Sequence, residues 1–369
     1  MKTIRRLLYR DIVASVFFVA LAFLSLFFFI DLVEELDGVG RRGRTTGHAL
    51  QAALLVLPSH FYDLFPVAVL IGTIYSLARM AQSSEFTILR TGGLGPGRAL
   101  ALLATLGAVF GLITFVTGDV IAPASERAAL QLKARFNGGI KLDGAGAWLK
   151  ERRSTPEGER SYSVNVAGAS GNGVLAGIRI FEFDSDGRLV SRTQAQEGRV
   201  AADGTWTLGD AEIAHWPLAR SEGAAVQVDK RTSLVWPSTL TASVVAAAVL
   251  PLGSMTTMEL WRYSAHLSDQ AQATQQYKIR FWRKALYPLA CLVMMALALP
   301  FAYLHARAGG VSLKVFGGIL LGISFVLLNN LAGFIGTLQG MAPWVAAAAP
   351  SGLYLLLSMA AFAWLVRYR

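Results

Sequence analysis

The chain has 369 residues, of which 54% are hydrophobic, with a mean hydropathy of +0.46 and a formal net charge of +10. This composition is too apolar for a soluble protein and indicates an integral membrane protein. The stretch 125–276 contains 16 basic and 16 acidic side chains, so the positive charge belongs to the apolar remainder and gives no reason to expect nucleic-acid binding.

Apolar runs that approach or exceed the roughly 20 residues needed to cross a bilayer recur along the chain. In order they are Ile12–Ile30, Ala49–Ala78, Ala99–Gly118, Ala285–Leu304 and Val315–Val366. The last is long enough for two spans, broken near Gln339–Pro343, so the sequence predicts six membrane helices. Acidic residues, and no small-residue cleavage site, follow the first run, which we therefore interpret as a retained span rather than a signal peptide.

Basic residues mark one end of these spans. Lysine or arginine precedes the first span, lies between the second and third and between the fourth and fifth, and ends the chain. The positive-inside rule places these segments in the cytoplasm and residues 125–276 outside. Arg41, Arg42 and Arg44 break the rule, because they follow the first span on its outer side. They are either an interfacial anchor or a clamp for an anionic lipid.

A short polar segment, Arg79–Arg98, joins the second and third spans. Its middle, Gln82–Thr91, predicts one short helix that Ser83 or Ser84 caps. Glu85 falls in the first turn, where a carboxylate complements the helix dipole, and a glycine-rich turn ends the helix. The segment is either an ordinary polar hairpin or a surface helix, clamped between two spans, that inserts into a partner's groove.

The soluble insert between the third and fourth spans predicts β structure. Its short runs bounded by turn residues are Ala147–Lys150, Tyr162–Val166, Gly177–Phe183, Leu189–Gln196, Trp206–Leu208 and Ala225–Val235. Asp186-Gly187 and Asp203-Gly204 are hairpin signals, and short antiparallel strands at this spacing favour a sandwich or jelly roll. The aromatic residues expected in its core, rather than on a ligand platform, are Trp148, Phe181, Phe183 and Trp206.

A helix is expected to lead from the insert back to the membrane. Thr256 and Glu259 match the T-x-x-E capping box at its start. The following stretch, Leu260–Gln276, contains few helix breakers, so the helix has room to run on into the fourth span.

Signatures of catalysis and of metal binding are absent from the sequence. No phosphate-binding loop occurs, and the five histidines show no metal-ligand spacing. Cys291 is the single cysteine, so no internal disulfide can form. We therefore expect no catalytic residue, no metal site and no cofactor bound by this chain.

Polar residues inside the spans are candidates for function, because burying them in lipid is costly. Asp63 in the second span is either a structural partner of another helix or a functional carboxylate. Asn329 and Asn330 are adjacent in the fifth span, so at least one of them should face protein or a cavity. At the outer end of the first span, one helix face carries Asp31, Glu34 and Glu35, and a solvated helix end is expected there.

Several stretches resemble the lipopolysaccharide export permeases of the LptF/LptG family, on the LptG side of that family. The matching stretches are FIDLVEEL, MAQSSEFTILRTGG, GDVIAPASE, GIRIFEFDSDGRL and LWRYSAHL…YKIRFWRKALYPLACLVMMALALPF. No single motif is long, but their order and spacing cover the whole chain and are specific together.

The resemblance implies an α-helical integral membrane protein with six transmembrane helices and an all-β, jelly-roll-like periplasmic domain between helices 3 and 4. The expected parts are 1–124 with a cytoplasmic coupling helix near 82–91, the periplasmic domain 125–255, and 256–369 with a connecting helix and the last three spans. Such a protein is a multi-pass permease subunit in the Gram-negative inner membrane. It belongs to an ABC-type complex that extracts lipopolysaccharide and passes it to a periplasmic bridge for outer-membrane biogenesis.

The resemblance also implies partners. They are a paralogous LptF-like permease, a cytoplasmic LptB-like ATPase dimer, and a single-span LptC-like protein that leads to the periplasmic bridge. ATP and Mg²⁺ would be used by the ATPase, which makes this chain a transmembrane subunit and not an enzyme.

Residue by residue, Glu85 matches the family's acidic residue in the helix that docks into the ATPase. The same coupling stretch contains Phe86, Arg90 and Gly92. In some family members, lysines at the outer end of the first span meet the lipid's phosphates. Asp31 lies in that region here, and the basic residues come later. The lipid-binding candidates are therefore Arg41, Arg42, Arg44, Asp31, Glu34, Asn329 and Asn330, with Asp63 as a further intramembrane polar residue.

Two other functions stay open at this point. A non-transporting membrane coupling subunit would transmit ATPase motion to the external domain, and it would need neither a wide cavity nor a lipid bound to the β domain. An enzyme with a membrane-buried active site would require Asp63 and the two asparagines of the fifth span to converge with a base or a metal.

Overall fold

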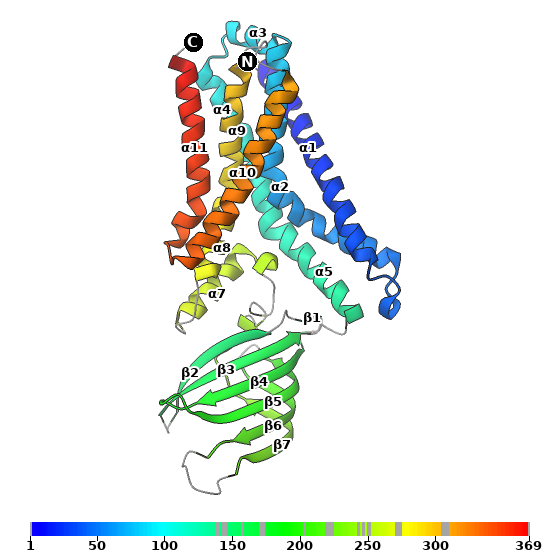
Figure 1. Ribbon diagram of the computed structural model, residues 1–369, viewed down its shortest axis with the longest axis vertical. Helices are drawn as coiled ribbons and strands as arrows, with labels where there is room; N and C mark the ends of the chain where they lie inside the picture. Colours follow the sequence, from blue (N-terminus) through cyan, green and yellow to red (C-terminus); the bar gives the residue numbers. More distant parts are fainter. Residues whose placement is uncertain are drawn as a thin grey trace. The chain divides into compact units, whose positions relative to one another are not determined.

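The computed structural model describes residues 2–137, 140–141, 146–155, 158–169, 174–201, 204–217, 225–241, 244–245, 248, 252–269, 275–303 and 310–367. The chain divides into two compact units, one built of long helices and one that contains the β-sheet (Figure 1). The membrane unit comprises Met1–Asp37, Ala53–Ser125 and Gln275–Arg369, and the insert unit comprises Gly38–Ala52 and Glu126–Thr274.

Long apolar helices build the membrane unit. In chain order the helices are α1 (Lys2–Leu36), α2 (Thr46–Gln82), α3 (Glu85–Thr91), α4 (Pro96–Val116), α8 (Gln275–Leu286), α9 (Pro288–Tyr303), α10 (Val311–Leu338) and α11 (Pro343–Arg367). Within the described ranges, five helices are long and apolar enough to cross a membrane, and a sixth span is present when the bent pair α8–α9 is counted as one. This agrees with the prediction of six spans.

The fourth span is bent by 52° where α8 meets α9. Pro288 is the first residue of α9, and proline both lacks an N–H donor and disfavours helical backbone in the residue before it. The connecting helix α7 (Thr257–Asp269) covers the start of the predicted stretch, and its expected continuation into the fourth span falls on 270–274, which lie outside the described residues. The predicted capping box is confirmed: Thr256 N–H donates to Glu259 Oε2 at 2.8 Å, and Glu259 N–H donates to Thr256 Oγ1 at 3.2 Å.

The core of the membrane unit follows α2. Most side chains from Phe65 to Met80 are buried, and Thr73 Oγ1 donates to Met295 Sδ at 3.0 Å. Two crossings depend on glycine, because an added Cβ would lie 2.5 Å from Val16 Cα at Gly72 and would also meet α9 backbone at Gly111. Small residues at such crossings let membrane helices approach closely and pack without voids.

The insert unit contains one antiparallel sheet. Its strands are β1 (Ile140–Lys141), β2 (Ala147–Thr155), β3 (Gly158–Ala169), β4 (Leu175–Phe183), β5 (Leu189–Val200), β6 (Trp206–His215) and β7 (Gln227–Trp236). The order is β1-β3-β4-β5-β6-β7, and β1 and β2 pair with successive parts of β3, so together they form one edge. Each of the six predicted runs overlaps one of these strands, which confirms the β prediction.

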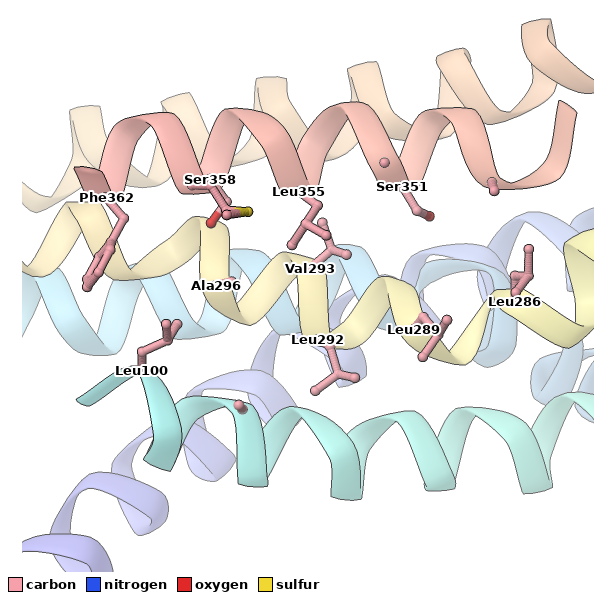
Figure 2. Close-up of a pocket in the computed structure, with 14 residues that line it drawn as sticks. Leu100, Leu286, Leu289, Leu292, Val293, Ala296, Ser351, Leu355, Ser358 and Phe362 are labelled. Atoms are coloured by element: carbon pink, nitrogen blue, oxygen red, sulfur yellow. The ribbon is translucent and has the colours of Figure 1, made fainter. Parts of the chain in front are cut away.

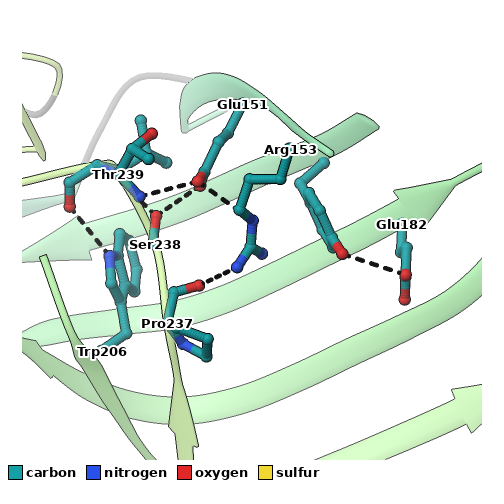
Figure 3. A network of polar contacts seen from close by, with 9 residues as sticks. Glu151, Arg153, Glu182, Trp206, Pro237, Ser238 and Thr239 are labelled. Carbon is teal, nitrogen blue, oxygen red and sulfur yellow. Dashed lines mark hydrogen bonds and ion pairs between the residues drawn. The ribbon is translucent and has the colours of Figure 1, made fainter. Parts of the chain in front are cut away.

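Contacts beyond β7 connect the two edges of the sheet. Glu151 on β2 is fully buried and accepts hydrogen bonds from Ser238 Oγ at 2.6 Å and from the Thr239 N–H at 2.8 Å (Figure 3). Arg153 Nε lies 3.2 Å from Glu151 Oε1, and the same guanidinium donates to the Pro237 carbonyl. Because β2 and β7 are at opposite edges, these contacts require the sheet to curl strongly.

Aromatic packing inside the sheet supports the same curl. Tyr162 on β3 and Trp236 on β7 meet edge to face with ring centroids 5.8 Å apart, although three strands separate them in the sheet. Tyr162 also donates to Glu182 at 3.2 Å, and burial first, then the Glu182 carboxylate, raises the pKa of Tyr162 above its usual value. The described strands thus form one rolled sheet, and the second sheet of a sandwich or jelly roll stays a prediction.

The expected aromatic core is confirmed in part. Trp206 is fully buried, and its indole N–H donates to the Leu240 carbonyl at 3.2 Å. Phe181 and Phe183 are half-buried. The placement of Trp148 in the core was wrong: half of it is exposed, and its ring stacks on Phe181 at 6.0 Å, because alternate residues of an edge strand face outward.

Candidate functional site

The polar segment between α2 and α4 folds as a sharp break followed by α3. α2 extends to Gln82, and Ser84 adopts a left-handed backbone conformation with φ of 64°. The predicted helix Gln82–Thr91 is therefore too long at its start. The predicted serine cap is also wrong: an N-cap residue needs extended backbone, Ser84 makes no capping bond, and Ser83 Oγ donates back to the Met80 carbonyl at 3.3 Å.

One face of α3 is anchored on the end of α9. Phe86 is only 2% exposed, and its ring meets Tyr303 edge to face at a centroid distance of 5.2 Å. Arg90, four residues further on the same face, places its guanidinium carbon 5.0 Å from the centre of the Tyr303 ring. These contacts fix the short helix to the fourth span.

The other face of α3 is exposed. Glu85, Thr87 and Ile88 are all exposed, with Ile88 at 67%. Gly92 ends the helix by donating its N–H to the Ile88 carbonyl at 2.9 Å, and Gly93 turns the chain at φ of 98°. Of the four predicted coupling residues, Phe86 and Arg90 lie on the anchored face of α3, Glu85 is exposed, and Gly92 follows the helix as its C-cap.

The acidic residues of α1 are not equivalent. Asp31 Oδ2 lies 2.8 Å from His60 Nε2 on α2, with 18% of the Asp31 side chain exposed, and the His60 ring packs on Phe27 at 4.8 Å. The expectation of a solvated helix end is therefore wrong for Asp31, because α2 supplies a partner for its carboxylate. Glu34 is exposed, as expected.

The basic cluster after α1 belongs to the insert unit. Arg41 begins a short 3-10 turn, Arg41–Gly43, and is exposed. Arg44 is half-buried and packs over Gly38, where an added Cβ would lie 2.5 Å from Arg44 Nη1. The side chain of Arg42 lies outside the described residues.

Polar residues of α2, α8, α9 and α10 contact one another in the membrane unit. The Tyr287 hydroxyl donates to the Asp63 backbone carbonyl, and Arg283 Nη2 donates to Asn330 Oδ1 at 3.2 Å. Asn329 is buried and donates to the Phe325 carbonyl of its own helix at 3.0 Å. The two asparagines thus have separate partners, and among the described residues no group of three or more acidic, histidine or cysteine side chains is placed to hold a metal.

An apolar groove of about 630 Å³ lies between α4, α9 and α11 (Figure 2). Its walls include Leu100 on α4, Leu292 on α9 and Leu355 on α11, which point into the space between the helices. Its lining, as far as the described residues show it, contains no charged side chain, so the groove suits hydrocarbon rather than a phosphate or a sugar.

Comparison with known proteins places these features in a family. The model of the family described as lipopolysaccharide export system permease LptF/LptG matches residues 6–367. The chain belongs to the LptF/LptG family. The LptG protein of Haemophilus influenzae is 24% identical over 358 residues, which cover 96% of each chain. The LptG protein of Escherichia coli K12 is 25% identical over 350 residues, which cover 91% of this chain and 92% of that protein.

Three contact residues of this LptF/LptG family member were missed by sequence reasoning. The contacts are those of His60 with Asp31, of Arg283 with Asn330, and of Tyr303 with Phe86. A histidine within the second apolar run and an arginine beside the fourth were visible signals, because polar groups at a membrane need partners. Nothing local to Tyr303 indicates its role, because Phe86 lies more than two hundred residues earlier in the chain.

Proposed function

We propose that this chain is a permease subunit that extracts lipopolysaccharide from the inner membrane and passes it to a periplasmic bridge, driven by ATP hydrolysis in a separate partner. The observation that carries this proposal is the division of α3 into an anchored and an exposed face in a chain of the LptF/LptG family. The two relatives are named lipopolysaccharide export system permease proteins, which supports the substrate class.

α3 is suited to transmit force from a partner into the membrane unit. Short connections join it to α2 and α4, and the contact of Phe86 with Tyr303 joins it to α9. A force that a partner exerts on Glu85 would therefore be transmitted to α2, α4 and α9 at the same time. A charge-assisted contact at Glu85 would also hold the partner in a fixed register.

The partner on this face, in the proposal, is a cytoplasmic ATPase dimer that binds ATP and Mg²⁺ itself. A paralogous permease and a single-span protein complete the complex. This arrangement puts α3 and both chain ends in the cytoplasm and the insert unit in the periplasm. The basic residues Arg79, Arg90 and Arg98 around α3 support this orientation.

On the outer side, we propose that Arg41, together with Arg42 and Arg44, meets the phosphates of lipopolysaccharide. Arg41 is exposed, and guanidinium groups bind phosphate through paired hydrogen bonds. Asp31 has the different role of holding α1 against α2 through His60, and Asn330 orients Arg283. Because Asn330 is engaged by Arg283, we propose that any lipid contact on α10 is made by other residues.

The proposal predicts that Glu85→Lys weakens binding of the ATPase. Replacing one member of an interfacial charge contact costs about 2–5 kcal/mol, so binding should fall by at least roughly tenfold. Thr87→Lys is the matched control, because Thr87 is also exposed on α3 and receives the same new charge. The measurements are co-purification of the ATPase with the full chain and ATP turnover of the assembled complex in proteoliposomes.

Wild-type ATPase binding and turnover in Glu85→Lys would remove the basis for coupling through α3. Equal losses in both variants would show only that added positive charge on α3 is not tolerated. A loss confined to Glu85→Lys, with the insert unit still folded, would support the proposal.

A further inference from the structure

A second pocket lies at the end of the membrane unit that carries α3. Its volume is about 390 Å³, within the range of about 300–1,000 Å³ that is typical of small-molecule sites. It lies between the start of α1, the first three turns of α4 and the turn that joins α3 to α4. Its lining residues are Ile4, Arg5, Leu94, Arg98, Ala101, Leu102 and Thr105.

The chemistry of this pocket changes along the helix axes. Its charged residues, Arg5 and Arg98, are close to the ends of α1 and α4, whereas Ala101 and Leu102 lie further into the span. Thr105, its remaining polar residue, donates its hydroxyl to the Ala101 carbonyl of its own helix. A cationic mouth above an apolar floor matches a phosphate headgroup above an acyl chain.

The two arginines keep donors available for a ligand. Arg5 and Arg98 are exposed, and Arg98 Nη1 donates to the Gly93 carbonyl at 3.3 Å, which uses one of the five N–H donors of a guanidinium. Asp11, the first acidic residue of α1, lies 2.8 Å from Arg79 and 3.9 Å from Arg10. Among the residues that the structure describes, no acidic side chain lines the pocket.

We propose that this pocket binds one anionic phospholipid of the leaflet at the α3 end, with its phosphate between Arg5 and Arg98 and an acyl chain along Ala101 and Leu102. Basic pockets between membrane helices bind anionic headgroups in this way, and guanidinium groups pair with phosphate oxygens. The proposal needs only a bilayer and does not depend on lipopolysaccharide export. The bound lipid touches Leu94, so it would also order the turn after α3.

The test uses the full-length protein and phosphatidylglycerol as the probe, with binding followed by native mass spectrometry from mixed phosphatidylglycerol–phosphatidylcholine nanodiscs. Each basic residue near a membrane surface changes the affinity for anionic lipid by roughly fivefold, so Arg5→Gln/Arg98→Gln should weaken binding about 25-fold. The matched control is Arg6→Gln/Arg10→Gln, which removes the same charge from exposed positions outside the pocket. The control should weaken binding clearly less than the pocket pair, because neither Arg6 nor Arg10 lines the pocket and only the general attraction of the surface for anionic lipid is reduced.

A further variant separates lipid from free anion. Ala101→Phe fills the apolar floor and leaves both arginines in place, so it should weaken phosphatidylglycerol binding but not competition by inorganic phosphate. Arg5→Lys/Arg98→Lys keeps the charge and should retain most of the affinity, which shows that a loss in the glutamine pair is not unfolding. Unchanged binding in the glutamine pair, an equal loss in the control pair, or no effect of Ala101→Phe would each overturn the proposal.

Discussion

Glu85 and Phe86 are neighbours in the chain but face different surroundings. Phe86 is buried against Tyr303, whereas Glu85 is exposed at the start of α3. A helix of seven residues is too short to be stable alone, so its position depends on the buried phenylalanine. The exposed carboxylate is useful to a partner only because its neighbour holds the helix in place.

At this scale we predict that Phe86→Ala releases α3 from α9. Removing a buried phenylalanine ring costs on the order of 3 kcal/mol, which is enough to melt so short a helix. Hydrogen exchange of residues 85–94 in the full chain should rise at least roughly tenfold by this estimate. Ile88→Ala is the control, because Ile88 is exposed on the same helix and should change little. Unchanged protection in Phe86→Ala would show that α3 is held by other contacts.

Elements differ in how far local sequence determines them. The β runs and the capping box of Thr256 and Glu259 were predictable, because turn residues and capping side chains act within a few positions. The bend before Pro288 was missed, although proline is itself a local signal. The curl of the sheet was not predictable, because it depends on the hydrogen bond between Ser238 and Glu151, which are 87 residues apart in the chain. Contacts between distant residues likewise decide which face of α3 is exposed.

The rolled sheet yields a prediction about Glu151. Glu151→Gln keeps the shape but removes the charge that Arg153, Ser238 and the Thr239 N–H all contact. Weakening a buried, charge-assisted network should lower the free energy of unfolding of the insert by about 2–3 kcal/mol. Thermal unfolding of the full chain, followed by near-UV circular dichroism, measures this. Glu159→Gln on the exposed side of β3 should leave the transition unchanged, and equal transitions for both variants would show that the charge of Glu151 does not stabilise the insert.

The net charge of +10 is unevenly distributed over the molecule. The stretch 125–276 is neutral, Arg41, Arg42 and Arg44 give the insert unit a formal charge of +3, and the remaining +7 lies on the membrane unit, where basic residues surround α3 and the chain ends. That asymmetry orients the chain in a bilayer. In our account, α3 transmits the motion of an ATPase on one side of the membrane, and the insert unit binds the exported lipid on the other side. A non-transporting coupling subunit would share the first half of this account but not the second.

The measurement that tests the account most directly is ATP-dependent release of lipopolysaccharide from proteoliposomes that contain the complete complex with this chain. The account predicts release to a soluble periplasmic acceptor only when ATP and Mg²⁺ are present, and loss of that release in Glu85→Lys but not in Thr87→Lys. Continued ATP turnover by the wild-type complex without any transfer of lipopolysaccharide would contradict it.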